Sequence, residues 1–170
     1  MIFNDYLSSS HKGLACLILA CAFVAAAAQG EPLPLQLPIV SDLEAAAKTA
    51  RDQRVPLLVA FTLKRCPYCN TARRDYWAPM NGSDKWRGKV AMVELVMDGT
   101  PTLRDFDGKS STPRDFARRF GVRSAPTVIV FDGFGAPAAQ PLVGLASGDF
   151  YGLYLEQSIE AGMTKVRESR

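Results

Sequence analysis

The stretch that decides the fold is LLVAFTL (57–63) followed by KRCPYC (64–69). An uninterrupted apolar run of this length is typical of a strand that is buried on both faces of a sheet. Pro67 suits the first position of a helix, because the N–H that proline lacks would have no helical partner there. The sequence therefore predicts a buried strand, a short turn that carries Cys66, and a helix that begins at Pro67.

On either side of this stretch, helical and strand patterns alternate. Ser41 and Glu44 form a capping-box pattern, which predicts a helix that continues over AAAKTARDQ (45–53). The remaining chain predicts a helix end near 79–82, a strand at 90–97, a loop at 99–111, a helix at 112–121, strands at 127–132 and 140–145, and a terminal helix at 149–162. This order predicts a single α/β domain with a central sheet covered by helices.

Length and composition limit the protein to few classes. The chain has 170 residues, a net charge of +3 and a single histidine. That length fits one globular domain. The basic residues are scattered along the chain, so the sequence predicts no nucleic-acid partner.

The N-terminal residues have the layout of an export signal. A polar segment (1–13) precedes an apolar run (14–28) that ends in three alanines, which suit a cleavage site. We therefore expect a secretory signal peptide over 1–28, an extended lead-in over 29–40, and a domain over 41–170 located in the periplasm. An uncleaved anchor is an alternative, although the run is shorter than the roughly 20 residues that span a bilayer. A lipoprotein signal at Cys21 fits poorly, because the apolar run continues past it.

Removal of the signal peptide would leave few side chains that could act as nucleophiles or metal ligands. Cys16, Cys21 and His11 would leave with the signal, so the mature chain would hold only Cys66 and Cys69 and no histidine. A zinc or iron–sulfur site needs about four ligands, which one such chain does not supply, so we expect no metal. The choice is between two inert buried thiols and a redox pair, and the polar residues beside Cys66 favour the redox pair.

The position of the pair gives the two cysteines different expected roles. The first turn of a helix has unpaired N–H groups and the positive end of the helix dipole, which stabilise a thiolate. With Lys64 and Arg65 adding positive charge, we expect the pKa of Cys66 to lie below its usual value of about 8.5. Cys66 would then attack disulfides, and Cys69, one helical turn deeper, would resolve the mixed disulfide.

A second motif, RSAPT (123–127), directly precedes a predicted strand. The proline could simply mark the end of a loop. Alternatively, a cis Ala125–Pro126 bond, which costs little before proline, would present the backbone of Ala125 to an extended substrate.

Together these segments resemble the thioredoxin superfamily from about residue 40 to 162. The segments that carry the resemblance are LLVAFTLKRCPYC (57–69), FGVRSAPTVIVFDG (120–133) and LVGLASGDFYGLYLEQSIEAG (142–162). The resemblance implies a thioredoxin-like fold with a mixed sheet and no cofactor besides the cysteine pair. It also implies that Cys66 attacks, that Cys69 resolves, and that Pro126 is a cis-proline beside them. The dipeptide Pro67-Tyr68 is similar to that of glutaredoxins.

Two residues depart from the thioredoxin pattern. Arg65 stands where thioredoxins have a tryptophan before the first cysteine, and Ala60 stands where they have a buried aspartate that assists proton transfer. The proton route to Cys69 therefore stays open. With the export signal, the chain resembles periplasmic thioredoxin-like proteins, including those associated with sulfur oxidation or cytochrome maturation.

The function that we expect is reduction of periplasmic protein disulfides by a monomer, with a membrane thiol reductase as its electron partner. The alternatives are a disulfide oxidase served by a membrane oxidase, a glutathione-linked reductase, and a non-catalytic peptide-binding module. Tyr68 would lie over the exposed sulfur and help to bind substrate, together with Pro67, Ala125 and Pro126. Arg73 and Arg123 are either ordinary surface charges or groups that steer acidic partners.

Overall fold

The computed structural model describes residues 36–145 and 148–168, so the expected signal peptide and most of the lead-in lie outside the described residues. The helices are α1 (Leu43–Gln53), α2 (Pro67–Ala72), the π-helical turn η1 (Arg73–Trp77), α3 (Ala78–Gly82), α4 (Pro113–Arg119) and α5 (Gly148–Glu168). The strands are β1 (Leu57–Thr62), β2 (Ala91–Val96), β3 (Leu103–Arg104), β4 (Ser110–Ser111), β5 (Thr127–Phe131) and β6 (Leu142–Val143). Within this described part of the chain, no helix is both long and apolar enough to cross a membrane.

The central sheet is mixed, and its strand order is β2-β1-β5-β6. β1 runs parallel to β2 and antiparallel to β5, and β6 pairs with β5 in the antiparallel sense. Every residue of β1 is buried, as expected for the apolar run that forms it. The carboxyl end of β1 leads directly to Cys66, so the sheet holds the cysteine pair at the edge where β1 and β2 both end.

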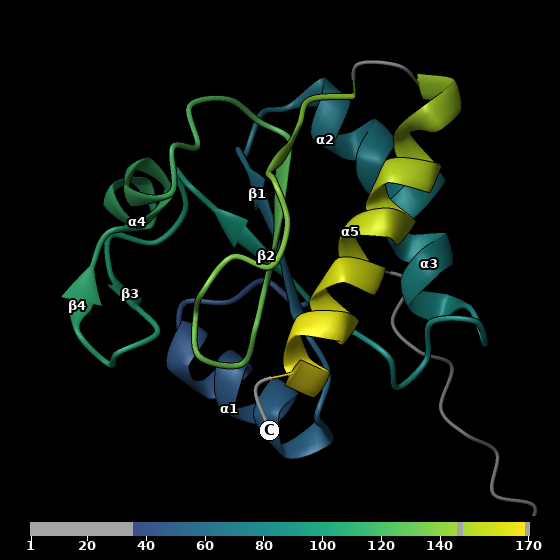
Figure 1. The fold of residues 1–170 in the computed structure, drawn as a ribbon. Helices are drawn as coiled ribbons and strands as arrows, with labels where there is room; N and C mark the ends of the chain where they lie inside the picture. Colours follow the sequence, from purple (N-terminus) through teal and green to yellow (C-terminus); the bar gives the residue numbers. More distant parts are fainter. Residues whose placement is uncertain (1–35, 146–147, 169–170) are drawn as a thin grey trace, which may run out of the picture. The chain divides into compact units, whose positions relative to one another are not determined.

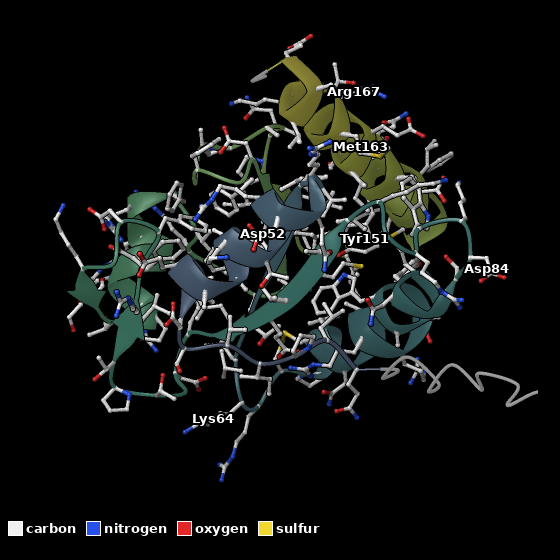
Figure 2. All side chains as sticks on the ribbon, turned by 90° about the horizontal axis from the view of Figure 1, so that it is seen from below. Asp52, Lys64, Asp84, Tyr151, Met163 and Arg167 are labelled. Carbon is white, nitrogen blue, oxygen red and sulfur yellow. A yellow bond between two sulfur atoms is a disulfide. The ribbon has the colours of Figure 1, made fainter. Side chains whose placement is uncertain are left out.

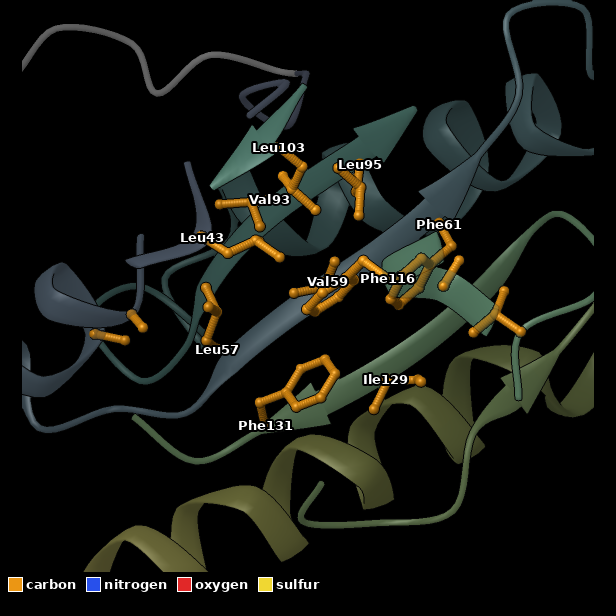
Figure 3. Packing of buried hydrophobic residues seen from close by; sticks show 14 of the residues in the cluster. Leu43, Leu57, Val59, Phe61, Val93, Leu95, Leu103, Phe116, Ile129 and Phe131 are labelled. Carbon is orange, nitrogen blue, oxygen red and sulfur yellow. The ribbon is translucent and has the colours of Figure 1, made fainter. Parts of the chain in front are cut away.

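Helices cover both faces of this sheet (Figure 1). Alternate residues of β1 belong to the two core clusters on its opposite faces. On one face, Leu57, Val59 and Phe61 pack with side chains from α1 and α4 (Figure 3). On the other face, Leu58 and Ala60 pack with side chains from α2, η1, α3 and α5. The result is a single domain with a helix–sheet–helix arrangement, as the sequence predicts.

The segment after the cysteines is helical from α2 through η1 to α3, with a π-helical turn in its middle. The N–H of Ala78 bonds to the carbonyl of Arg73, five residues back. Pro79 follows at once, and proline neither donates an N–H nor tolerates the normal carbonyl position four residues earlier. A wider turn before the proline keeps the segment helical, which the sequence pattern alone did not indicate.

The structure corrects the predicted helix start and a predicted loop. The cap of α1 is Asp42 rather than Ser41, because the Asp42 carboxylate accepts the N–H of Ala45 at 2.8 Å. The predicted loop at 99–111 contains the two-stranded ribbon β3–β4. The turn of this ribbon includes Asp107-Gly108, with Gly108 at a φ of +77°.

The terminal helix is also longer than predicted. The pattern of apolar residues ends near 162, but α5 continues to Glu168. Met163, directly after the predicted end, packs against the core cluster that contains Tyr151, and the lysine, arginine and glutamate that follow are good helix formers.

Candidate active site

Cys66 and Cys69 form a disulfide, with an Sγ–Sγ distance of 2.03 Å. The two cysteines differ in access to solvent, because Cys66 is 7% exposed and Cys69 is fully buried. An incoming disulfide can therefore reach only the sulfur of Cys66 without moving the chain. The sequence predicts that Cys66 attacks and that Cys69 resolves, and this assignment stays a prediction.

The start of α2 supplies a hydrogen bond to the outer sulfur. Cys66 is the N-cap of the helix, and its Sγ accepts the N–H of Cys69 at 3.1 Å. Pro67 occupies the first turn, where proline fits without loss of a helical hydrogen bond. The unpaired N–H groups and the positive end of the helix dipole thus lie next to the sulfur of Cys66.

Two cations precede the pair on the turn from β1. The side chains of Lys64 and Arg65 are exposed, and Lys64 projects from the body of the protein in Figure 2. The backbone N–H of Lys64 donates to the carboxylate of Asp98, just beyond β2, at 2.8 Å. This bond ties the turn to the neighbouring strand end, while the ammonium of Lys64 stays in solvent.

The other residues expected at the site differ in their exposure to solvent. Pro67 is exposed, and the ring of Tyr68 is 68% exposed, which leaves it available for contact with another molecule. The peptide bond between Ala125 and Pro126 is cis. Ala125 is half-buried and Pro126 is buried, and the Pro126 carbonyl accepts the N–H of Gly144 at 2.7 Å.

The sequence analysis did not identify a buried carboxylate that contacts the helical segment formed by α2 and η1, which we call the cysteine helix. Glu94 is 2% exposed, and its partner in the register of β1 and β2 is Ala60. Its Oε1 accepts the hydroxyl of Thr62 at 2.6 Å, and its Oε2 accepts the Nε of Arg73 at 2.9 Å. A second guanidinium N–H of Arg73 also donates to Oε1, so the ion pair is bidentate.

This ion pair corrects the interpretation of Arg73. The residue is neither an ordinary surface charge nor a group for steering partners, because its guanidinium neutralises the buried carboxylate of Glu94. The hydrogen bond that Arg73 donates to Glu94 raises the pKa of Arg73 further above its already high value. The charge of Glu94 within the apolar run at 90–97 was the available signal, but only the strand register places it opposite Ala60.

A second buried polar contact fastens the cysteine helix to α5. The indole N–H of Trp77 donates to the hydroxyl of Tyr151 at 3.0 Å, and Tyr151 lies in the interior in Figure 2. Burial raises the pKa of Tyr151 to about 12, and the bond from Trp77 opposes this only in part. Trp77 belongs to η1, which continues the helix that begins after Cys66, so this bond holds that segment to α5.

No metal centre accompanies the cysteines in the residues that the structure describes. Across 36–145 and 148–168, no three histidine, cysteine, aspartate or glutamate residues lie close enough to hold a metal ion. The chemistry that this arrangement can perform is the opening and closing of the Cys66–Cys69 bond.

Comparisons with known proteins point to one family. The family model of the thioredoxin-like domain matches residues 43–158. The fold is similar to that of a thioredoxin h from poplar, with a TM-score of 0.51, 13% identity, and coverage of 72% of this chain and 96% of that one. A thioredoxin from Malassezia sympodialis gives a TM-score of 0.50 and 14% identity, with coverage of 75% of this chain and 91% of that one. A comparison with curated proteins found no match.

Proposed function

Because this chain belongs to the thioredoxin-like domain family, we propose that it is an exported thiol–disulfide oxidoreductase that reduces protein disulfides in the periplasm. The observation that carries the proposal is the Cys66–Cys69 disulfide at a helix start, with the N–H of Cys69 donating to the outer sulfur. That donor stabilises negative charge on Cys66 once the bond is open, and the thiolate is the nucleophile in disulfide exchange.

The reaction begins with the reduced pair. The Cys66 thiolate attacks one sulfur of the substrate disulfide, a Cys66–substrate bond forms, and the released substrate thiolate takes a proton from water. The Cys69 thiolate then attacks the Cys66 sulfur and releases the second substrate thiolate, which is also protonated. The substrate gains two electrons and two protons, and the protein ends as the Cys66–Cys69 disulfide. A dithiol of a membrane reductase then returns two electrons to the pair.

The arrangement of the pair supports this order of events. Cys69 is buried beneath Cys66, so it meets a substrate only through the mixed disulfide. Tyr68 on one side, and Ala125 with Pro126 on the other, would provide the surface on which the substrate lies. The export pattern at 1–28 supports the periplasmic location.

Insulin reduction with a dithiol donor tests the activity. The mature protein should precipitate insulin chains, whereas Cys66→Ser should abolish the reaction. Cys69→Ser should instead accumulate a mixed disulfide with the substrate, visible by mass spectrometry. Activity that survives loss of Cys66 would contradict the proposal and favour a module that binds peptides without turnover. Recovery from a periplasmic fraction of a chain that begins after Ala28 tests the export.

A second function, disulfide oxidation, is favoured by one specific observation. Lys64, Arg65 and the N–H of Cys69 all stabilise the thiolate, and a more stable thiolate makes the disulfide a stronger oxidant. Equilibration of the pair with glutathione and dithiothreitol buffers separates the two functions. A potential near that of thioredoxin, about −270 mV, supports the reductase, and one near −120 mV supports the oxidase.

A further inference from the structure

We propose that a cavity between the turn before Cys66 and the loop before Ala125 selects protein substrates whose cysteine is flanked by acidic residues and one apolar side chain. This inference rests on the proposed function and adds a substrate class to it. The cavity has a volume of about 320 Å³. Its lining residues come from the end of β1, the end of β2, α4 and the loop before β5: Leu63, Met97, Arg114, Arg118, Val122, Arg123 and Ser124.

The cavity is placed where a bound substrate would reach it. Leu63 lies on the turn from β1 to Cys66, and Ser124 directly precedes Ala125 in the loop before β5. These two segments carry the disulfide and the cis peptide bond, respectively. A polypeptide that presents a cysteine to Cys66 therefore passes this cavity with its neighbouring residues.

The rim of the cavity carries more positive charge than its carboxylates compensate. All three charged lining residues are arginines. In the described part of the chain, Arg114 and Arg123 have no ion-pair partner, whereas Arg118 pairs with Asp115, one turn before it on α4. Exposed guanidinium groups without internal partners are free to pair with carboxylates of another molecule.

The turn before Cys66 extends this positive rim. Lys64 and Arg65 are exposed and have no ion-pair partner among the described residues. The nearest acid that contacts this turn is Asp98, whose carboxylate accepts the backbone N–H of Lys64. The turn and the rim together carry five cations, and among the residues that the structure describes only Asp98 and Asp115 contact them with a carboxylate. The excess of positive charge attracts an incoming acidic segment.

The apolar floor of the cavity favours a polypeptide over glutathione as the source of the carboxylates. Met97 is 9% exposed, Val122 is 4% exposed and Leu63 is half-buried, so the floor is apolar. Glutathione has two carboxylates but no apolar side chain, and would leave this floor unfilled. A polypeptide with a leucine-like side chain beside its cysteine fills the floor and can place acidic neighbours on the rim.

Three disulfide-linked peptides test the inference. They share one length and contain Glu-Leu-Cys-Glu, Lys-Leu-Cys-Lys or Glu-Ser-Cys-Glu. Because exposed ion pairs each contribute little, we expect kcat/KM for the first peptide to exceed that for the second by only about tenfold at low salt. The difference should shrink at about 0.5 M salt, where exposed charges are screened. The serine peptide should react more slowly than the leucine peptide.

A charge-matched pair of variants locates the preference. Arg114→Gln with Arg123→Gln removes two rim cations, and the preference for the acidic peptide should fall to less than about twofold. Arg54→Gln with Lys89→Gln removes the same charge just before β1 and β2 begin, at the end of the sheet opposite the cysteines. That control should keep the wild-type preference, and an equal loss in both double variants would overturn the inference.

Two further substrates separate this inference from the proposed function. If the neutral disulfide of 2-mercaptoethanol is reduced but the peptides show no charge preference, the inference fails and the oxidoreductase stands. If no disulfide is reduced, the proposed function fails. Faster turnover of glutathione disulfide than of the acidic peptide would contradict the choice of a protein substrate.

Discussion

At the scale of single residues, the pair of Arg73 and Glu94 gives an asymmetric prediction. Arg73 is partly exposed, whereas Glu94 is almost completely buried. Arg73→Met leaves a buried carboxylate without its cation, and we expect a loss of about 3–5 kcal/mol in the free energy of unfolding. Glu94→Gln leaves an arginine that can turn to solvent, and should cost only about 1–2 kcal/mol. Urea denaturation of the oxidised proteins measures both, and the reverse ranking would contradict this description of the pair.

Tyr151 gives a prediction about pH. Its pKa is raised to about 12 in the folded protein, whereas an unfolded tyrosine titrates near its usual value of about 10. The unfolded chain therefore loses this proton first, and the stabilisation present below pH 10 is lost as the pH rises toward 12. Tyr151→Phe should be less stable at pH 7 by about 1–3 kcal/mol, because the N–H of Trp77 loses its acceptor.

The comparison between the two proteins isolates this titration. Between pH 9.5 and 11.5, the wild type should lose stability that Tyr151→Phe does not lose. The difference in free energy of unfolding between the wild type and the variant should therefore become smaller. Denaturant midpoints measured in parallel cancel the titration of the other tyrosines and lysines. A constant gap over this range would show that Tyr151 titrates as an unfolded tyrosine does.

Residue roles could be predicted where a local pattern determines them. Cys66 and Cys69 stand beside a strand end and a helix-starting proline, so their place at a helix start follows from the sequence. Arg73 could not be assigned, because its partner Glu94 lies on another element. A pairing of this kind depends on strand register and on the direction of a helix, neither of which is encoded within a few residues.

At the scale of elements, two glycines of α5 make a matched pair. A Cβ at Gly162 would lie 2.6 Å from Val130 Cγ1 and 2.8 Å from Pro56 Cβ, whereas a Cβ at Gly152 meets only the ring of Tyr76, at 3.7 Å. Gly162→Ala should therefore destabilise the protein by about 1–3 kcal/mol, because the helix must shift from the sheet. Gly152→Ala should stabilise it by about 0.5–1 kcal/mol through helix propensity alone.

Thermal unfolding of the two variants provides the measurement. Both substitutions improve the intrinsic helix propensity equally. If one raises the melting temperature and the other lowers it, the difference can arise only from packing. If Gly162→Ala also raised the melting temperature, the close approach of α5 to β5 would be wrong.

Elements that depend on tertiary contacts could not be predicted from the sequence, whereas those with a strong local pattern could. The apolar runs placed β1, β2 and β5 within a residue or so of their observed ends, because a strand buried on both faces leaves a clear signal. The ribbon β3–β4 was missed because its strands are only two residues long. It is held by contacts outside itself: the N–H of Arg104 bonds to the carbonyl of Ser41, and the buried Asp105 pairs with Arg119.

At the scale of the whole molecule, the two core clusters share the strands of one sheet, so we expect them to unfold together. Both tryptophans of the chain, Trp77 and Trp86, lie in the cluster on the α5 side. Val59 lies in the cluster on the opposite face. Val59→Ala should lower the stability by about 2 kcal/mol, and tryptophan fluorescence should report the same shift in midpoint as far-ultraviolet circular dichroism. Separate midpoints would show that the two faces unfold independently.

The order of the elements and the family resemblance together predicted the overall architecture. The covered α/β sheet and the family are both confirmed. The alternation of helices and strands indicates a covered sheet, but it does not give the strand order. That order depends on which strands pair with one another, and the resemblance as stated implied only a mixed sheet, so the order β2-β1-β5-β6 comes from the structure.

The ion pair of Arg73 with Glu94 also has a consequence for motion. The ion pair holds the end of α2 to β2. A change in backbone conformation that accompanies reduction of the disulfide should therefore not extend past Arg73. Hydrogen–deuterium exchange should therefore change with oxidation state only near 64–70, while the amides of η1 and β2 keep their protection. Repeated opening and closing of the disulfide, which the proposed function requires, should therefore leave the packing of the interior unchanged.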